Sequence, residues 1–275
     1  MSANVARDLK PVDALEVQVL VDNVTDSLST VPKDVTNEGT VLVRNGSLKM
    51  GAGEYRCCAH HGLSLIITAR SGNAKRTLIF DAGPEAYTVT RNGGLLKVPF
   101  GDAGALVLSH GHWDHAGGLV EAVRQVVAAN GGRAVECHVN PGMFAVRGNR
   151  LFSDEVLLQK PVPSVRELTD AGATVVNAPE ARLILDSMFY VSGEIPRVTP
   201  YERGLPGHLK RAADGKSWEP DPLLMDERYV AAHVKGKGAV VFTACSHAGV
   251  INVLKDARNV CGDVPLWAVM GGFHL

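Results

Sequence analysis

The sequence lacks the features that mark disordered, fibrous, membrane-spanning or nucleic-acid-binding proteins. Hydrophobic residues make up 45% of the 275 residues and charged residues 21%, proportions that exclude disorder and fibrous repeats. Lys and Arg number 28 against 29 for Asp and Glu, so the net charge of -1 offers no general basic surface for nucleic acid. No apolar run approaches the roughly 20 residues of a membrane span. We therefore expect a globular protein whose partner is a small-molecule substrate, with no nucleic acid and no membrane.

Cysteine is also scarce, and its pattern excludes a disulfide framework. There are five cysteines, an odd number, and Cys57 and Cys58 are adjacent, which is a poor geometry for bridging each other. The Cys-Cys-Ala-His-His segment at 57–61 resembles a metal-binding tract, but no second Cys/His pair follows at a zinc-finger interval. The N-terminal segment carries charges where a signal peptide would need an apolar core. These features predict a cytoplasmic protein.

Hydrophobic periodicity predicts a chain dominated by strands, with helices placed between some of them. Helical spacing covers residues 118–129, 164–171 and 250–257. Such a mixture favours an α/β (α+β) fold in which two sheets pack together and helices cover the outer faces. Short β-branched runs predict strands at residues 15–21, 63–68, 77–80, 105–108, 134–139, 174–176, 188–191, 229–234, 239–243 and 266–270.

Two polar segments interrupt this pattern and predict long loops. Residues 22–55 contain four glycines, and residues 195–226 contain five prolines. Loops of this length within a compact domain are commonly functional. Otherwise the sequence shows no internal repeat, which predicts a single domain over residues 1–275.

The strongest functional signal is a histidine-rich loop between a predicted strand and a predicted helix. His110, His112, Asp114 and His115 lie within six residues, directly after the apolar run 105–108. Three imidazoles and a carboxylate can converge on one point only in a tight turn at the end of a strand. Neutral imidazole binds zinc, iron and related metals, and a carboxylate adds compensating charge. The segment therefore predicts a metal site.

This HxHxDH string resembles the metal-binding motif of the metallo-β-lactamase superfamily. The segment Leu-Ile-Phe-Asp-Ala-Gly at 78–83 is similar to the strand and Asp-Gly turn that the superfamily places upstream. The resemblance implies a four-layer αββα sandwich, with one or two metals at the edge between two sheets. It further implies that His110 and His112 serve a first metal, and Asp114 and His115 a second. The metal implied is Zn²⁺, with Mn²⁺ or Fe²⁺ as alternatives.

Four further segments are similar to one branch, the dihydropterin-aminobenzene phosphate synthase-like proteins. They lie at residues 61–64, 192–197, 242–252 and 270–274, and the match extends from about residue 17 to the last residue. His247 and His274 follow strands 239–243 and 266–270, and their placement with the resemblance implies that both are metal ligands. Because the chain stops one residue after His274, we expect either a longer natural protein or a tethered chain end.

Three residues of these segments, His61, Glu194 and Arg197, are candidates for substrate binding. The family pattern places His61 near the pocket, although a histidine before Gly62 could simply cap a strand. Arg197 lies at the start of the proline-rich loop, where its guanidinium could hold a phosphate or carboxylate by two hydrogen bonds. The alternative for Arg197 is a surface ion pair.

One departure from the superfamily pattern concerns the carboxylate between the metals. Many members carry an Asp on a turn where this chain has Thr-Ala-Cys-Ser-His at 243–247. A hairpin pairing that sets Val234 opposite Ala239 would bring Asp226 near His247. Asp226 could then bridge the metals or orient His247, with Glu194 as its rival and a solvated acid as the alternative for each.

These residues favour a metal-dependent hydrolase-type enzyme in which Asp114, and Asp226 if it bridges, take part in catalysis. A pterin-phosphate synthase using the same metals is the more specific implication of the resemblance. A redox diiron protein is disfavoured because those members carry Glu where His112 stands and are usually fused to a flavin domain. A nuclease is disfavoured by the net charge of -1. The oligomeric state stays open, including a homo-oligomer.

Overall fold

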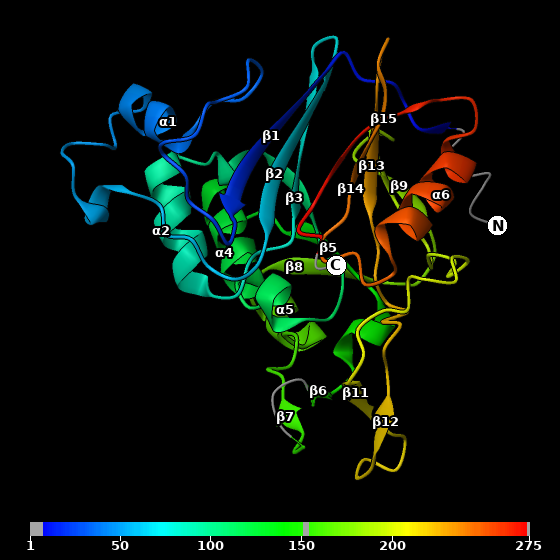
Figure 1. Ribbon diagram of the computed structural model, residues 1–275. Coiled ribbons are helices and arrows are strands. Elements are labelled where there is room, and N and C mark those ends of the chain that lie inside the picture. The colour runs from blue at the N-terminus through cyan, green and yellow to red at the C-terminus, as the bar shows by residue number, and fades with distance from the viewer. Residues whose placement is uncertain (1–7, 151–153, 274–275) are drawn as a thin grey trace.

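The computed structural model describes residues 8–150 and 154–273, which form two β-sheets packed face to face with helices outside them (Figure 1). The first sheet has the strand order β1-β2-β3-β4-β5-β8 and the second the order β15-β14-β13-β10-β9. The strands of the first sheet are β1 (Ala14–Val21), β2 (Ser64–Ser71), β3 (Ala74–Phe80), β4 (Ala103–Val107), β5 (Val135–Val139) and β8 (Ala173–Asn177). Those of the second are β9 (Arg182–Ile184), β10 (Phe189–Val191), β13 (Val230–Val234), β14 (Gly238–Phe242) and β15 (Leu266–Met270).

Alternating side chains along the strands build three separate apolar layers. In β3, Leu78 and Phe80 pack between the two sheets, whereas Ile79 packs under the helices of the first sheet. In β14, Phe242 points between the sheets and Val241 points outward to a helix. Since successive strand residues face opposite sides, this pattern requires both faces of each sheet to be covered. The fold is therefore the predicted αββα sandwich.

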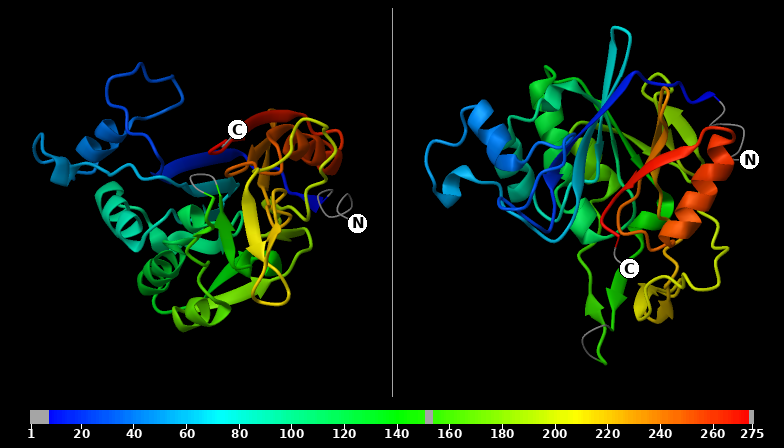
Figure 2. Two further views of the ribbon diagram at one scale, coloured as in Figure 1. Left: turned by 60° about the horizontal axis from the view of Figure 1, so that its bottom comes forward. Right: turned by 45° about the horizontal axis from the view of Figure 1, so that its top comes forward.

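Helices supply the two outer layers (Figure 2). The first sheet is covered by α2 (Ala86–Leu96), α4 (Leu119–Ala129) and α5 (Val165–Asp170), whose apolar side chains join the outer core of that sheet. The second sheet is covered by α6 (Val250–Cys261) through Val253, Ala257 and Val260. All ten predicted strands and all three predicted helices are present. Helix α2 was not predicted, because its Thr, Val, Asn and paired Gly residues have low helix propensity.

A small third sheet lies beside the two main sheets and is called here the appended sheet. Its strand order is β12-β11-β6-β7, and it extends below the sandwich in Figure 1. The strands are β6 (Arg147–Asn149), β7 (Leu157–Leu158), β11 (His208–Arg211) and β12 (Trp218–Pro220). Strands β11 and β12 fall within residues 195–226, where we predicted only loop. Strands of three or four residues are too short to show a readable alternation.

The other predicted loop, residues 22–55, also contains regular structure. Helix α1 (Glu38–Arg44) is capped by the Asn37 side chain, which accepts from the amide of Thr40, and a 3₁₀ turn covers Gly53–Tyr55. A helix of seven residues is shorter than two turns of clear periodicity, so the pattern did not reveal it.

The hairpin between β13 and β14 differs from the predicted register by one residue. Val234 pairs with Gly238, and His233 pairs with Ala239. The connection therefore has three residues, and Gly236 provides its left-handed backbone with a φ of 71°. The prediction that Val234 lies opposite Ala239 is wrong, and the residues that approach His247 change accordingly.

Parallel pairing of β3, β4 and β5 brings three strand ends to one edge of the first sheet. The loop from Leu108 to the start of α3 (Trp113–Ala116) leaves β4 at this edge, facing the start of β13 and the end of β14 in the opposite sheet. Polar side chains that follow these strands therefore meet between the sheets. Among the residues that the structure describes, no helix is long and apolar enough to cross a membrane.

Candidate metal centre

The histidine-rich loop is buried at the junction of the two sheets. His110 is fully buried, and the other residues of the motif, His112, Asp114 and His115, are at most 5% exposed. Gly111 allows the loop to fit, because a Cβ at this position would lie 2.4 Å from the carbonyl oxygen of Met143. A buried loop that carries three imidazoles and a carboxylate requires specific polar partners.

Asp81 provides those partners at both ends of the loop. It follows β3 and adopts a left-handed backbone with a φ of 58°. Its Oδ1 accepts from the amide of Ser109 at 2.7 Å, and its Oδ2 accepts from Ser109 Oγ at 2.8 Å. Oδ2 also accepts from His115 Nδ1 at 2.7 Å. A single buried carboxylate thus fixes the start of the loop and the orientation of the His115 ring.

This network also sets the tautomer of His110. Because the Ser109 hydroxyl donates its hydrogen to Asp81, its oxygen accepts from His110 Nδ1, which lies 2.8 Å away. The hydrogen of neutral His110 is then on Nδ1, and Nε2 presents a lone pair. That Nε2 lies 3.0 Å from His112 Nδ1. A nitrogen lone pair aimed at a second imidazole nitrogen is the arrangement that a cation between them would stabilise.

Two groups of side chains bring potential metal ligands together, and they share His110. In the imidazole group, His110, His112 and His247 place their ligand atoms within 4.8 Å of one another. In the thiol group, His110, His115 and Cys245 do the same. All five residues are buried. Within the described part of the chain, neither group includes Cys57 or Cys58, so the metal tract suggested by residues 57–61 does not form.

Cys245 was not predicted as a ligand. Its Sγ lies 3.0 Å from His115 Nε2, which is also 3.3 Å from Asp114 Oδ2. The signal was present in the sequence, because the 243–247 turn is the place where the superfamily resemblance led us to look for a carboxylate. The chain provides a thiol there instead. Thiolate, imidazole and carboxylate together form a typical zinc donor set.

Histidine pKa values shift downward in the imidazole group, whereas that of His115 in the thiol group shifts upward. Burial, followed by the neighbouring imidazoles, holds the pKa of His110 and of His112 well below the usual range. Burial acts in the same direction on His115, but Cys245, Asp81 and Asp114 outweigh it and raise the pKa of His115 well above its usual value. Burial would raise the pKa of Asp114, yet His115 and His112 outweigh it and hold that pKa low. Burial raises the pKa of the Cys245 thiol to about 11.

His247 joins the imidazole group from the opposite sheet, after β14. Its ring centroid lies 5.0 Å from that of His110 and 4.9 Å from that of His112. Glu227 holds its backbone: the carboxylate accepts from the amides of His247 at 3.0 Å and Ala248 at 2.5 Å. Burial raises the pKa of Glu227 to about 7. Sequence reasoning named Asp226 for this neighbourhood, whereas the structure places Glu227 there.

Asp226 lies on the other side of the loop, against Gly111 and Arg147. Its Oδ2 accepts from the Gly111 amide at 2.9 Å, and its Oδ1 accepts from Arg147 Nη2. Arg147 Nη1 in turn donates to the Gly111 carbonyl at 3.2 Å. The pair therefore holds the Gly111 peptide from both sides. Contact with a metal remains a prediction for Asp226.

The predicted substrate-binding residues are placed differently from one another. His61 has an exposed fraction of 55% for its side chain, and its Nε2 lies 3.5 Å from Asp114 Oδ2. Arg197 uses its guanidinium within its own loop, donating to the carbonyls of Leu223 at 2.6 Å and Leu224 at 2.9 Å. Glu194 is exposed beyond β10. His274, the remaining predicted ligand, lies outside the described residues.

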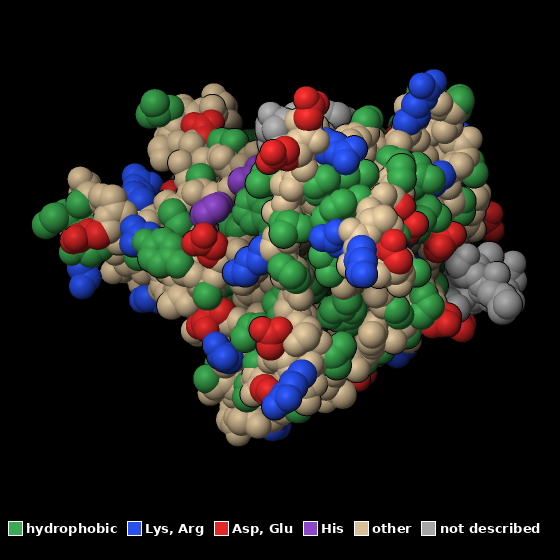
Figure 3. Space-filling model, turned by 90° about the horizontal axis from the view of Figure 1, so that it is seen from below, with side chains coloured by type: hydrophobic (Ala, Val, Ile, Leu, Met, Phe, Trp, Pro, Cys, Tyr) green, Lys and Arg blue, Asp and Glu red, His purple; other side chains and the backbone are tan. Residues whose placement is uncertain are grey.

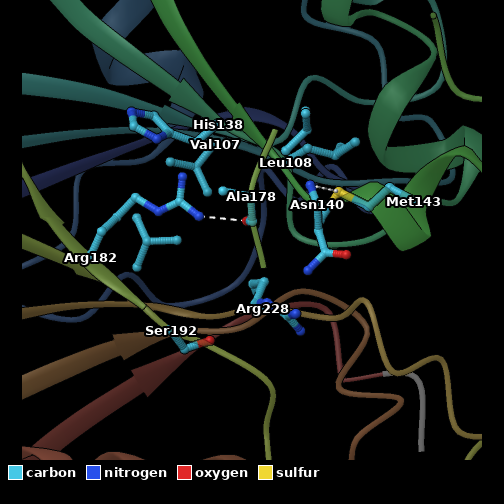
Figure 4. A pocket seen from close by; sticks show the side chains of 11 residues that line it. Val107, Leu108, His138, Asn140, Met143, Ala178, Arg182, Ser192 and Arg228 are labelled. Atoms are coloured by element: carbon cyan, nitrogen blue, oxygen red, sulfur yellow. Dashed lines mark hydrogen bonds between the residues drawn. The ribbon is translucent and has the colours of Figure 1, made fainter. Parts of the chain in front are cut away.

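A separate small cavity lies between the carboxyl ends of β4 and β5 and the second sheet (Figure 4). Its lining includes Leu108, His138, Asn140, Arg182 and Arg228. Residues of the imidazole and thiol groups are not among the described residues that line it, so it is distinct from the metal centre. On the face shown in Figure 3, histidine reaches the surface only in a small area, as the burial of both groups leads one to expect.

His208 is a further residue that sequence reasoning missed. It lies on β11 of the appended sheet, and its Nε2 is 3.0 Å from His112 Nε2. A lone histidine within a segment predicted as loop carried no motif, so its position beside His112 could be found only from the fold.

Comparison with known proteins agrees with this fold. The chain matches no family model. It is 30% identical over 217 residues to an uncharacterised protein of Methanocaldococcus jannaschii, covering 79% of this chain and 73% of that protein. It is 24% identical over 224 residues to the 7,8-dihydropterin-6-methyl-4-(β-D-ribofuranosyl)-aminobenzene-5'-phosphate synthase of the same organism, covering 79% and 71%.

The fold is also shared with a crystal structure described as a metal-dependent hydrolase of the β-lactamase superfamily. The TM-score is 0.63 at 18% identity, and the likeness covers 95% of this chain and 77% of the other. The chain therefore has the metallo-β-lactamase fold, and it belongs to the same family as the uncharacterised Methanocaldococcus jannaschii protein.

Proposed function

We propose that the protein is a metal-dependent enzyme of the hydrolase type, with two metal ions held by the imidazole and thiol groups. The observation that carries the proposal is the convergence of buried ligand atoms, which lie within 4.8 Å of one another in each group. Within the imidazole group, His110 Nε2 and His112 Nδ1 are 3.0 Å apart. His110, which belongs to both groups, would lie next to both ions.

The donor set fits divalent metals of the zinc type. Imidazole suits zinc and iron, and the Cys245 thiol favours these softer ions over magnesium or calcium. Once bound, the metals would supply Lewis acidity, polarising a carbonyl or phosphoryl oxygen and activating a water molecule. We propose Zn²⁺ as the natural ion, with Fe²⁺ or Mn²⁺ as alternatives.

The protein's own residues would orient this chemistry. Asp81 holds the His115 ring through Nδ1 and the loop through Ser109, so the donors need not reorganise. Asp114, with its pKa held low, stays ionised, and its Oδ2 lies 3.5 Å from exposed His61. His61 is therefore a candidate contact for substrate.

The proposed substrate is a small molecule that is phosphorylated or pterin-like. The burial of the donors behind the loops of both sheets leaves no broad surface for a macromolecule at the centre. The phosphorylated pterin in the name of the 24% identical relative motivates the chemical class. That relative also favours a second candidate, a synthase that joins two such molecules using the same centre.

The test combines metal analysis with a substrate screen on one preparation. Purified protein is analysed for metal content, and the same sample is assayed against phosphoesters, lactones, thioesters and pterin phosphates, each with and without a chelator. We expect about two metal ions per chain and turnover of at least one class that the chelator removes and added Zn²⁺ restores. Joining of a pterin with an aminobenzene phosphate, without hydrolysis, would select the synthase.

His233→Ala serves as a matched control for histidine removal. His233 lies in β13 and belongs to neither donor group, so its loss should leave metal content unchanged. Wild-type protein that takes up no metal, with turnover insensitive to chelation, would contradict the proposal.

A further inference from the structure

His208 contacts the metal centre from the appended sheet, in a part of the fold where the sequence predicted only loop. We infer that His208 is a positioning residue: it accepts a hydrogen bond from His112 Nε2 and so fixes the tautomer in which His112 Nδ1 faces the metal position. The inference rests on the metal centre proposed above and adds how one of its ligands is oriented.

The tautomer of His208 follows from the partner of its other nitrogen. His208 Nδ1 lies 3.0 Å from the backbone carbonyl oxygen of Asp221. A carbonyl oxygen can only accept, so Nδ1 carries the hydrogen. In the neutral ring Nε2 then has a lone pair and is an acceptor.

The tautomer of His112 follows in turn. His208 Nε2 and His112 Nε2 are 3.0 Å apart, so one of them must donate, and only His112 can. The hydrogen of His112 is therefore on Nε2. Its Nδ1 is left with a lone pair that points to His110 Nε2, at 3.0 Å. A chain of hydrogen bonds from the Asp221 carbonyl through His208 thus prepares His112 as a ligand.

The opposite side of the centre reaches the same result by a different route. There Asp81 and Ser109 place the hydrogen of His110 on Nδ1 and leave Nε2 with its lone pair. The two lone pairs face each other because the other nitrogen of each ring donates a hydrogen bond to a fixed partner. His208 therefore has the same role for His112 as Ser109 has for His110.

The appended sheet gives His208 little freedom to move. His208 is 1% exposed and pairs with Asn149 in the ladder between β11 and β6. On β6, Arg147 binds the Asp221 carboxylate at 3.2 Å from its Nε, and it also donates to the Gly111 carbonyl. The same small sheet thus contacts the HxH loop at two points, through an imidazole and through a guanidinium.

Direct metal ligation by His208 is disfavoured by the same distances. His208 approaches His112 at Nε2, whereas His110 approaches it at Nδ1, on another side of the ring. Consistently, the described residues whose ligand atoms converge do not include His208. Partners that orient a metal-binding histidine typically change metal affinity by 10 to 100-fold when they are removed.

Two substitutions separate the His112 contact from the rest of the His208 environment. In His208→Asn, the side-chain amide can still donate to the Asp221 carbonyl but is too short to reach His112. In His208→Gln, the longer side chain can present its carbonyl oxygen to His112 Nε2. Zn²⁺ affinity is measured by competition with a chromophoric chelator, and thermal melting of the metal-free proteins reports whether each variant folds.

We expect the Asn variant to bind its first Zn²⁺ about 10 to 100-fold more weakly, and the Gln variant to remain within about threefold of wild type. Equal affinities for Asn and wild type would overturn the inference. Equal losses for Asn and Gln would overturn it as well, because His208 would then act as a ligand or as bulk packing.

A measurement on the wild type keeps the test independent of how the variants fold. Imidazole ¹⁵N NMR of the metal-free protein reports which nitrogen of His112 carries the hydrogen. Nε2–H on His112 supports the inference, and Nδ1–H overturns it. If wild-type protein bound no Zn²⁺ while His112 carried Nε2–H, the proposed function would fail and the hydrogen-bond chain through His208 would stand.

Discussion

The two donor groups share His110 but are built from different chemistry. In the imidazole group, His110 and His112 are oriented by uncharged partners, the Ser109 hydroxyl and the His208 ring. In the thiol group, His115 lies between the Asp81 and Asp114 carboxylates and the Cys245 thiol. One half of the centre is therefore neutral, and the other concentrates acidic side chains.

This difference suggests how the proposed centre would bind two cations: the ligands of one group would compensate the charge of its ion less than those of the other. Neutral imidazoles leave the charge of a bound ion uncompensated, so it would remain the stronger electrophile. A thiolate and a carboxylate largely neutralise the ion beside them. In the metal-free protein burial lowers the pKa of His112, whereas the acidic neighbours of His115 outweigh burial and raise its pKa.

Removing His110 should have the largest effect, because both donor groups converge on this residue. His110 belongs to both groups, but its single free lone pair, on Nε2, can bind only one ion. We expect His110→Ala to lose that ion and to hold the other more weakly, with a fall in metal-dependent turnover of at least about 1000-fold, since metal catalysis contributes several kcal/mol. Metal content and turnover of the purified variant provide the measurement. His233→Ala is the control, and full activity in His110→Ala would remove the metal-enzyme reading.

Substituting a residue that belongs to only one of the two groups should affect the metal of that group alone. Cys245→Ser should lower metal content to about one ion and weaken that group by more than about 100-fold, while His247→Ala should do the same to the imidazole group. Cobalt substitution distinguishes them, because only a thiolate-bound cobalt gives an intense near-ultraviolet charge-transfer band. The band should vanish in Cys245→Ser and persist in His247→Ala. Loss of both metals in either variant would show that the groups act as a single site.

The sequence predicted those parts of the centre that lie close together in the chain. The HxHxDH loop and its strand are local, and so are the alternating runs that build the two sheets. Cys245 was missed because the resemblance directed attention to a carboxylate at that turn. His208 and Glu227 were missed because their contacts depend on β11 pairing with β6 and on the path of the chain before β13. Contacts of that kind are set by packing over long sequence separations.

The buried carboxyl of Glu227 should make stability depend on pH at the imidazole group. Its pKa is raised from 4.5 to about 7 by burial. Its contribution is thus fully present below pH 4.5 and is lost as pH rises through about 7. The loss should approach roughly 3 kcal/mol between these values.

Urea unfolding of metal-free wild type and Glu227→Gln at pH 5 and pH 8 measures this contribution. The difference in unfolding free energy should move in favour of the Gln variant at the higher pH, because Gln does not titrate. Equal differences at the two pH values would show that Glu227 does not titrate in this window.

The smallest effect is expected at His61, which touches the acidic half of the centre from outside. Its side chain is 55% exposed and lies 3.5 Å from Asp114 Oδ2, so the pair adds at most about 1 kcal/mol to stability. His61→Ala should therefore leave metal content unchanged. As a substrate contact, however, His61 should affect binding: we expect KM to rise about three- to tenfold, in line with one exposed hydrogen bond of roughly 1 kcal/mol, while kcat changes little. An unchanged KM would remove His61 from substrate binding, and loss of one metal would place it instead among the residues that hold the acidic half together.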